Sequence, residues 1–256
     1  MTPQALQACL DDHVRALEAC NQRGRRMLSL VDLIDAGTVD LPLAAYLAAT
    51  MRSGASLLVG ARPGGAGKTA VMCALLNFLP DHTAIQPIAS PSVLAAAQRD
   101  ANPGDTCYLA HEIGAGSWYA YVWGAQARAF FALTTQGHIV ASNLHADTPQ
   151  ETRDQLCREN RVAEAHLDAV ALKVYLRMAR SQGWSVRRWV SHVYESDGTG
   201  DRMLWMGDGK GTHARQANST IVSPEQESEY AELLTALRRQ NARRIKDVRQ
   251  ALVRHQ

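Results

Sequence analysis

The segment from residue 55 to residue 79 constrains the fold more than any other part of the sequence. It begins with a short apolar stretch, residues 55–61 (ASLLVGA), and continues through a glycine-rich loop that ends in Lys68 and Thr69. Apolar residues with helical spacing follow up to Leu79. A buried strand, a glycine turn and a helix in this order form the local structure that a phosphate-binding loop requires. The segment therefore predicts an α/β fold.

The loop over residues 62–69 (RPGGAGKT) has the residue types that hold nucleotide phosphates. Glycines let successive backbone N–H groups approach a phosphate, and the following helix points its positive N-terminal end at the same oxygens. In such loops the lysine bridges the β- and γ-phosphates, and the next hydroxyl is a ligand of Mg²⁺. We therefore expect ATP as the ligand, with Mg²⁺ held by Thr69. The residues predicted to bind the nucleotide are Pro63, Gly64, Gly65, Ala66, Gly67, Lys68, Thr69 and Ala70.

The loop departs from the usual G-x-x-x-x-G-K-[ST] pattern at its first position, where Arg62 replaces glycine. Gly60 lies two residues earlier and does not restore the spacing. The alternative interpretation is a glycine-rich turn that precedes a lysine by coincidence. The flanking strand and helix favour the phosphate-binding loop, because that loop needs both of them.

Other apolar stretches predict the remainder of a mainly parallel sheet. Residues 106–110 and 138–144 predict buried strands, and a long apolar helix is expected between them, from about 119 to 133. Strands that alternate with helices imply parallel pairing through right-handed crossovers. After residue 171 apolar and polar residues alternate, which predicts half-buried strands in an added antiparallel group. These strands are expected at residues 172–178, 187–195 and 201–206.

Composition divides the chain into four expected parts. They are an N-terminal helix and linker over residues 1–25, a core with the antiparallel extension over 26–211, a polar linker over 212–224 and an amphipathic helix over 225–256. Thr2 is predicted to cap the first helix, residues 21–26 to form its linker, and two short helices broken at Gly37 to precede the first strand. The last helix carries a basic cluster just after four glutamates, a pattern that favours a solvated helix face.

Charge, cysteine content and hydropathy exclude several classes of protein. The formal net charge of +2 produces no field that would attract nucleic acid, so we expect no such partner. The five cysteines are scattered without a CxxC pair, which argues against a disulfide framework or a zinc site and predicts the cytoplasm. No stretch reaches the roughly 18 apolar residues of a membrane span. Any contact with a membrane machine is therefore expected to pass through partner proteins.

A hydrolytic phosphate-loop protein also needs a carboxylate that activates water near the γ-phosphate. Glu112 follows the predicted strand at 106–110, after His111. Its carboxylate is expected at the carboxyl edge of the sheet, where nucleotides bind in open α/β folds. The alternative for a single glutamate in this place is a solvated strand end.

Residues 134–149 (TTQGHIVASNLHADTP) resemble the histidine box of the type II and type IV secretion ATPases and pilus motors, in which TGH precedes a strand and an S-x-LH pattern. Residues 108–113 (YLAHEI) resemble the Walker B segment of that family, and residues 28–79 resemble the segment that leads into its Walker A loop. The resemblance covers about residues 26–195. It implies a RecA-like P-loop ATPase core.

The resemblance implies roles for particular residues. Glu112 would be the catalytic carboxylate, and His138 and His145 would sense the nucleotide or couple subunits. A histidine can donate a hydrogen bond to a γ-phosphate or a neighbouring carboxylate and lose that bond after hydrolysis. Ser142 and Asn143 could add a sensor hydrogen bond. The family also implies a homo-oligomer, expected here as a hexamer that forms with nucleotide or a partner, and proteins of a membrane machine as partners.

Several residues depart from the family pattern. Residues 84–90 (AIQPIAS) contain no carboxylate where the family has its acidic box, and His111 replaces the glycine before the glutamate. Gly114 and Ala115 replace the arginine-aspartate pair that follows it, and about 25 residues precede the core where family members have a large domain. We therefore expect weak self-association. Candidates for an arginine supplied to a neighbouring subunit are Arg128, Arg153 and Arg158.

Two functions remain open at this point. The first is an ATP-hydrolysing motor, which the loop, the carboxylate and the two histidines favour. The second is a degenerate nucleotide-binding subunit with a regulatory or scaffolding role and no significant turnover, which the missing acidic box favours. A DNA-acting RecA-like motor is a weaker third alternative, supported by the basic C-terminal helix alone.

Overall fold

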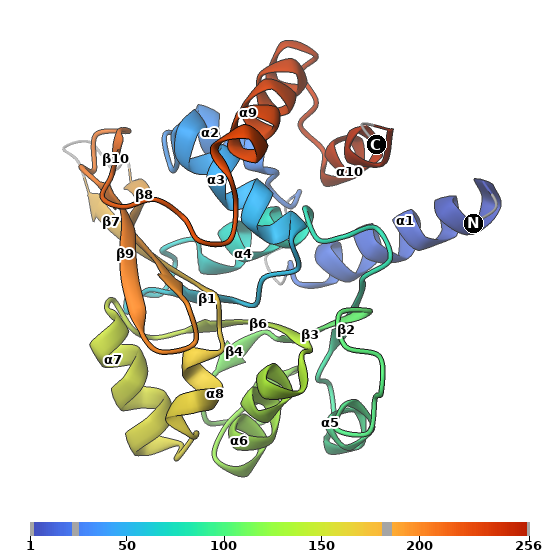
Figure 1. The fold of residues 1–256 in the computed structure, drawn as a ribbon, viewed down its shortest axis with the longest axis vertical. Coiled ribbons are helices and arrows are strands. Elements are labelled where there is room, and N and C mark those ends of the chain that lie inside the picture. The colour runs from blue at the N-terminus through green and yellow to red at the C-terminus, as the bar shows by residue number, and fades with distance from the viewer. Residues whose placement is uncertain (1–2, 22–25, 181–185, 255–256) are drawn as a thin grey trace.

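The structure is a computed structural model that describes residues 3–21, 26–180 and 186–254. The predicted cap at Thr2 and most of the linker expected at 21–26 lie outside these residues. The strands of the main sheet are β1 (Leu57–Gly60), β2 (Ala84–Pro87), β3 (Thr106–Ala110), β6 (Ile139–Leu144), β7 (Leu172–Arg180), β8 (Val186–Ser196), β9 (Asp201–Gly207) and β10 (His213–Arg215). Among the described residues they form one eight-stranded sheet in the order β10-β9-β8-β7-β1-β6-β3-β2 (Figure 1).

The sheet combines a parallel part with an antiparallel part. β1 pairs in parallel with both β6 and β7, and β3 pairs in parallel with β6 and β2. β7, β8, β9 and β10 follow one another as antiparallel neighbours. The chain therefore has a mixed α/β fold with a mostly parallel sheet and an antiparallel extension, as the change of sequence period predicted.

Helices cover both faces of the sheet (Figure 1). One face carries α1 (Pro3–Ala19), α2 (Leu30–Asp35), α3 (Leu41–Arg52), α4 (Lys68–Leu76), α9 (Pro224–Arg239) and α10 (Ile245–Arg254). The other face carries α5 (Pro91–Ala97), α6 (Ala125–Ala132), α7 (Pro149–Arg153) and α8 (Glu164–Asp168). None of the described helices is long and apolar enough to cross a lipid bilayer.

The two faces correspond to two separate hydrophobic clusters. Along β1, Leu57 and Val59 pack into the first cluster and Leu58 packs into the second. This alternation follows from the pleat of a strand, in which successive side chains point to opposite faces. Because helices cover both faces, β1 is buried along its whole length, which explains its unbroken apolar sequence.

Several predicted elements are confirmed. The strand expected at residues 106–110 coincides with β3, and the strand expected at 138–144 begins one residue later as β6. Two short helices, α2 and α3, lie on either side of Gly37, whose φ of +66° suits a turn. The strands β8 and β9 are joined by a short turn that contains Asp197 and Gly198.

The prediction of a long helix from about 119 to 133 is wrong for the first turns of that helix. Tyr121–Val122 forms a short strand, β5, which pairs with β4 at Glu112–Ile113, and α6 begins only at Ala125. Ala120 and Gly124 both have positive φ, of +56° and +57°, so the backbone cannot continue as a helix through them.

The prediction of half-buried strands after residue 171 is also corrected. The first five residues of β7 are all buried, including the polar Lys173 and Tyr175. Lys173 Nζ pairs with Asp201 at 2.6 Å, and the Tyr175 hydroxyl bonds that of Thr152 at 2.7 Å. Apolar and polar residues do alternate along β7, but helices and neighbouring strands cover both of its faces. The polar side chains are therefore buried, and each has a hydrogen-bond or ion-pair partner.

Residues 212–224 do not form the free linker expected from their composition. Residues 213–215 form β10, and Val222 is buried in the first hydrophobic cluster. The buried carboxylate of Glu195 accepts hydrogen bonds from the Ser219 hydroxyl, from the backbone and hydroxyl of Thr220, and from the Tyr46 hydroxyl. The polar residues therefore attach this segment to the sheet.

The single helix expected over residues 225–256 is divided. α9 ends at Arg239, Asn241 takes a positive φ of +55°, and α10 begins at Ile245. The break turns α10 so that Arg249, expected on a solvated face, is buried at the end of α4. The basic cluster is thus divided between exposed and buried positions.

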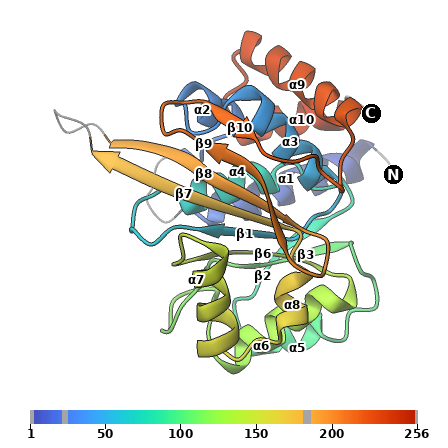
Figure 2. The same ribbon diagram turned by 60° about the vertical axis from the view of Figure 1, so that its left-hand side comes forward.

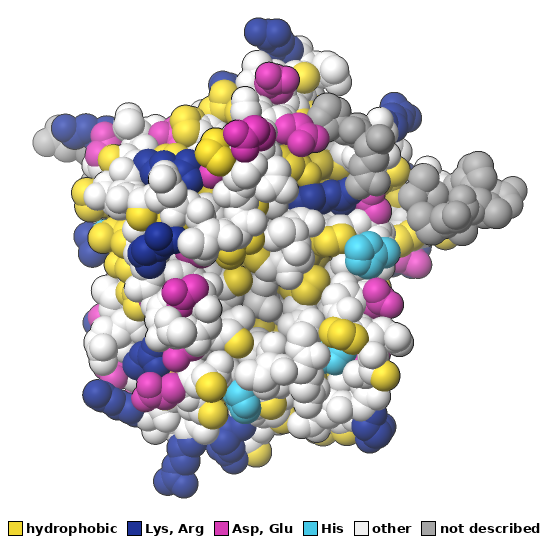
Figure 3. Space-filling model, viewed as in Figure 1, with side chains coloured by type: hydrophobic (Ala, Val, Ile, Leu, Met, Phe, Trp, Pro, Cys, Tyr) yellow, Lys and Arg dark blue, Asp and Glu magenta, His cyan; other side chains and the backbone are white. Residues whose placement is uncertain are grey.

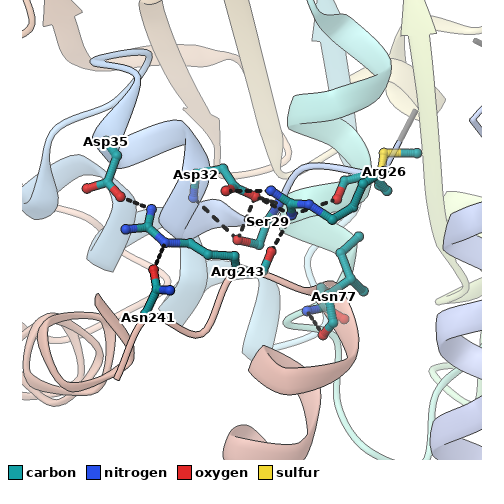
Figure 4. Close-up of polar contacts among 9 residues, drawn as sticks. Arg26, Ser29, Asp32, Asp35, Asn77, Asn241 and Arg243 are labelled. Atoms are coloured by element: carbon teal, nitrogen blue, oxygen red, sulfur yellow. Dashed lines mark hydrogen bonds and ion pairs between the residues drawn. The ribbon is translucent and has the colours of Figure 1, made fainter. Parts of the chain in front are cut away.

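Arg26 connects the first described residues of the core to the C-terminal helices (Figure 4). Its guanidinium bonds both carboxylate oxygens of Asp32, at 2.8 and 2.9 Å, and donates to the carbonyl of Arg243. Asp32 also completes the capping box of α2 with Ser29, while Arg243 pairs with Asp35. One polar network therefore fixes the start of the core against the connection between α9 and α10.

Candidate functional site

The glycine-rich loop connects β1 to α4 in a conformation that needs glycine. Gly65 and Gly67 have φ values of +82° and +99°, a region that residues with a Cβ rarely occupy. Gly60 serves packing instead, because a Cβ there would lie 2.5 Å from the carbonyl oxygen of Ala146 and 2.6 Å from the ring of Tyr175. Gly60, which lies two residues before the usual first glycine of the loop, is therefore explained by close packing and not by phosphate binding.

The first turn of α4 faces a cavity. Gly67 is its N-cap residue and has no side chain that could bond the first N–H groups. Uncapped N–H groups and the positive end of the helix dipole together attract an anion. Residues 64–70 line the cavity, whose volume is about 490 Å³.

Lys68 begins α4 and is almost completely buried, with 8% of its side chain exposed. Its Nζ donates to the carbonyl of Ala61 at 3.2 Å and lies 3.4 Å from Oε1 of Glu112. Burial lowers the pKa of Lys68, and the carboxylate of Glu112 partly offsets that effect. The loop therefore holds a poorly solvated cation at the positive end of a helix.

Glu112 lies at the carboxyl edge of the sheet, where the sequence predicted it, and the structure places it beside Lys68. Its side chain is 13% exposed, and Oε1 lies 3.6 Å from Nε2 of His145. That oxygen accepts no hydrogen bond from any described residue. A buried carboxylate oxygen without a donor can accept one from a ligand or water.

His145 and Asn143 connect the end of β6 to the loop. His145 Nδ1 lies 3.0 Å from the carbonyl of Arg62 and donates to it, so Nε2 faces Glu112. Asn143 Nδ2 donates to the carbonyl of His111 at 2.9 Å and to the Thr69 hydroxyl at 3.4 Å. The end of β6, the end of β3 and the start of α4 therefore meet at one place.

His138 does not lie at this site. It precedes β6 whereas His145 follows it, so about 20 Å of strand separate the two histidines. His138 is buried, with Nε2 3.2 Å from the carbonyl of Asp100 and its ring edge-on to Tyr108. Ser142 is buried too, and its hydroxyl donates to the carbonyl of Asn143. The predicted sensing pair is thus separated, and His138 occupies a packing position.

Sequence reasoning missed several residues that line the cavity, among them Cys20 and Met27. The Cys20 thiol lies 3.5 Å from Nε2 of His111, and hydrogen bonds with Cys73 and His111 lower the pKa of Cys20 to about 6. No spacing in the sequence indicates that the end of α1 reaches the loop. Conversely, Pro63, which was predicted to bind nucleotide, does not line the cavity.

Two other cavities have volumes of about 580 and 540 Å³. Arg52, Asp81 and Gly137 line the first, and Asp168, Ser196 and Thr220 line the second. Arg52 and Asp81 already pair with each other, at 2.8 Å. The cavity at the loop is smaller, but it alone of these three contains Lys68, Glu112 and His145 together, so it is the stronger candidate.

The three arginines considered for a neighbouring subunit have partners within their own chain. Arg128 donates to the carbonyl of Asn160, and Arg158 pairs with Asp154. Arg153 pairs with both Glu164 and Asp168. None of the three lines the cavity at the loop.

Solved structures that are similar to part of this chain include two ATPases. The VirB11 ATPase from the Brucella suis type IV secretion system, in complex with sulphate, has 19% sequence identity and a TM-score of 0.40, over 66% of this chain and 57% of that chain. The ATPase DotB from Legionella pneumophila has 11% identity and a TM-score of 0.38, over 88% of this chain and 58% of that chain. The matches span less than two thirds of either ATPase. No family model and no curated protein matches the sequence.

Proposed function

We propose that this chain binds ATP at residues 64–70 of the loop, which line the cavity, and hydrolyses it. The observation that carries the proposal is the buried ammonium of Lys68 at the N-terminus of α4, beside Glu112 and His145. A cation at the positive end of a helix is unfavourable unless an anion joins it. Phosphate oxygens would accept hydrogen bonds from both Lys68 and the uncapped N–H groups of the helix.

The residues of the cavity also fit Mg²⁺. The Thr69 hydroxyl lies at the cavity and accepts a weak hydrogen bond from Asn143, so an oxygen lone pair remains for a metal. Mg²⁺ in nucleotide sites takes one or two protein oxygens and completes its shell with phosphate and water. When bound, it would neutralise charge that develops on the β- and γ-phosphates.

Glu112 is proposed to act as the general base. Its carboxylate lies 3.4 Å from Nζ of Lys68, and phosphate would compete with it for that ammonium. The freed carboxylate oxygen could then accept a proton from water. His145 lies beside it, with Nε2 3.6 Å from Oε1 of Glu112. Because Nδ1 of His145 is bonded to the carbonyl of Arg62, a change in the loop would move the histidine as well.

The resemblance of the histidine box extends the proposal to a motor similar to the secretion and pilus ATPases. We propose residues 26–211 as its core, a hexamer formed with nucleotide or a partner, proteins of a membrane machine as partners, and the cytoplasm as its location. Lys and Arg are interspersed with Asp and Glu on the face shown in Figure 3, which gives no argument for nucleic acid.

A second candidate is a nucleotide-binding subunit without significant turnover. It is favoured by β2, which contains no carboxylate where the related ATPases have their acidic box. Steady-state ATPase measurement combined with light scattering, with and without a non-hydrolysable ATP analogue, separates the two. Turnover and a nucleotide-dependent ring support the motor. A monomer that binds ATP without turnover supports the second candidate.

The binding proposal is tested by calorimetric titration of Lys68→Ala with ATP and Mg²⁺. We expect no measurable binding, because the change removes the cation nearest the uncapped turn of α4. Lys210→Ala, an exposed lysine in the turn after β9, is the matched control and should bind as the wild type does. Wild-type affinity in Lys68→Ala would show that the loop does not bind the nucleotide.

A further inference from the structure

The antiparallel hairpin of β7 and β8 reaches the phosphate loop. Figure 2 shows these two strands extending well beyond the parallel part of the sheet. Near the free end of the hairpin, Nε of Arg188 donates to the carbonyl of Gly65 at 2.8 Å. Its Cδ lies 3.5 Å from the position that a Cβ on Gly67 would occupy. An arginine far along the chain therefore lies directly against the loop.

Most of the hydrogen-bond donors of Arg188 have no partner among the described residues. A guanidinium has five N–H donors, and only the one on Nε has a partner among the described residues. Arg188 is exposed and forms no ion pair within the part of the chain that the structure describes. Arg188 is not among the residues that line the cavity. It contacts the loop through Gly65, and its two terminal NH₂ groups, which have no partner among the described residues, could reach a phosphate bound there.

The neighbouring arginine has a different position. Arg187 donates to the carbonyl of Gly209, in the turn after β9. Successive side chains of a strand point to opposite faces, so Arg187 and Arg188 cannot both face the loop. The pair therefore provides two adjacent arginines of the same hairpin, of which one contacts the loop.

We propose that Arg188 is a phosphate-binding residue of the nucleotide site, supplied by the same chain. The inference rests on the proposed ATP binding and adds a second cation to Lys68. A nucleoside triphosphate carries several negative charges, which Lys68 and one Mg²⁺ together do not balance. A planar guanidinium bonds two phosphate oxygens at once, which a lysine ammonium does not do in the same fixed geometry.

Arg188 could instead only support the loop through Gly65, and the substitutions must separate these roles. Arg188→Gln keeps a donor for the carbonyl but removes the charge, and Arg188→Lys keeps the charge. We expect Arg188→Ala and Arg188→Gln each to weaken ATP binding about 10-fold, the loss of one charge-assisted contact. Arg188→Lys should weaken ATP binding less than these two substitutions do. Arg187→Ala should bind ATP as the wild type does.

The measurement is calorimetric titration of the full chain with ATP and Mg²⁺ at two salt concentrations, with melting temperatures of each variant as a check on folding. Loss of binding in Arg188→Ala but not in Arg188→Gln would overturn the proposal in favour of a supporting role. Wild-type binding by Arg188→Ala would overturn it outright. If Lys68→Ala binds normally, the proposed function itself fails, which is a distinct result.

Discussion

Helix α4 has a buried cation at each end, and the two are held in different ways. At the N-terminus Lys68 is 8% exposed, donates to one carbonyl and faces a carboxylate 3.4 Å away. At the C-terminus Arg249 is 2% exposed and donates to the carbonyls of Asn77, Leu79 and Pro80. Arg249 also lies 3.3 Å from Asp81. Burial lowers the pKa of both, to about 10 for Arg249.

The helix dipole explains what the difference means. A cation at the C-terminal end is attracted by the dipole. Arg249 there bonds the carbonyls of the C-cap residue and of the chain that follows the helix. A cation at the N-terminal end is repelled by the dipole, and Lys68 there donates a hydrogen bond to only one carbonyl among the described residues. We infer that Arg249 stabilises the fold and that Lys68 is retained for a ligand. The predictions below test this division, beginning with the largest expected effect.

Arg249→Met should lower the free energy of unfolding by about 3 kcal/mol, because the carbonyls of Asn77 and Pro80 lose their side-chain donor. Leu79 and Asp81 would keep only their bonds to Arg52. Urea unfolding followed by circular dichroism measures the change. Arg254→Met, at the exposed end of α10, is the matched control and should change stability little. An equally small change in stability for Arg249→Met would show that Arg249 does not stabilise the fold.

Glu112→Gln should reduce turnover at least ~10²-fold, about 2.7 kcal/mol in activation free energy, while ATP binding is kept. The amide cannot take a proton from water but still fits beside Lys68. The measurement is steady-state phosphate release, with the exposed Glu232→Gln as control. Unchanged turnover would place the general base elsewhere or trace the hydrolysis to a contaminant.

His13 should make the protein sensitive to acid at the C-terminal end of α4. Burial, with a smaller effect of Arg249, lowers the pKa of His13 to about 3, whereas the unfolded chain binds the proton near 6.5. Stability is therefore complete above pH 6.5 and falls as the pH drops from 6.5 towards 3. At pH 5 the loss is about 2 kcal/mol.

Urea unfolding between pH 7 and pH 5 tests this prediction. In His13→Leu the free energy of unfolding should fall by about 2 kcal/mol less between pH 7 and pH 5 than in the wild type. His82→Asn, a substitution at an exposed histidine, should leave the pH dependence as in the wild type. If His13→Leu and the wild type keep the same slope, the buried histidine is not the acid-sensitive group.

Lys68→Met should change the free energy of unfolding without nucleotide by no more than about 1 kcal/mol. The substitution removes a buried charge and its repulsion by the dipole, and in exchange leaves Glu112 without its cation. Urea unfolding at pH 7 measures it beside Arg249→Met. A loss as large as that of Arg249→Met would show that Lys68 too holds the fold together.

The sequence predicted the parts of the site that depend on local chain order. The strand, loop and first turn of α4 are contiguous, so their residue types predict their structure. Glu112 could be placed beside Lys68 because the carboxyl ends of neighbouring parallel strands meet at one edge. The same rule separates His138 from His145, since the two ends of a strand lie at opposite edges.

Helix boundaries and the burial of polar residues were harder to predict from the sequence. The break at Asn241 depends on one residue with positive φ, which composition does not reveal. Without that break, Arg249 belongs to a basic stretch that resembles any solvated helix face. The burial of Lys173 and Tyr175 was missed for a similar reason, because alternation indicates two faces but not what covers each of them.

By itself the sequence determined a glycine-rich loop between a strand and a helix in a mixed α/β fold, with a carboxylate at the edge of the same sheet. Those features follow from hydrophobic periodicity, glycine conformation and strand order, which are properties of short segments. Only the tertiary structure brought Cys20 and Arg188 to the loop and Arg249 to the end of α4. Such contacts join segments far apart in the chain, and they depend on how helices and strands pack rather than on any local pattern.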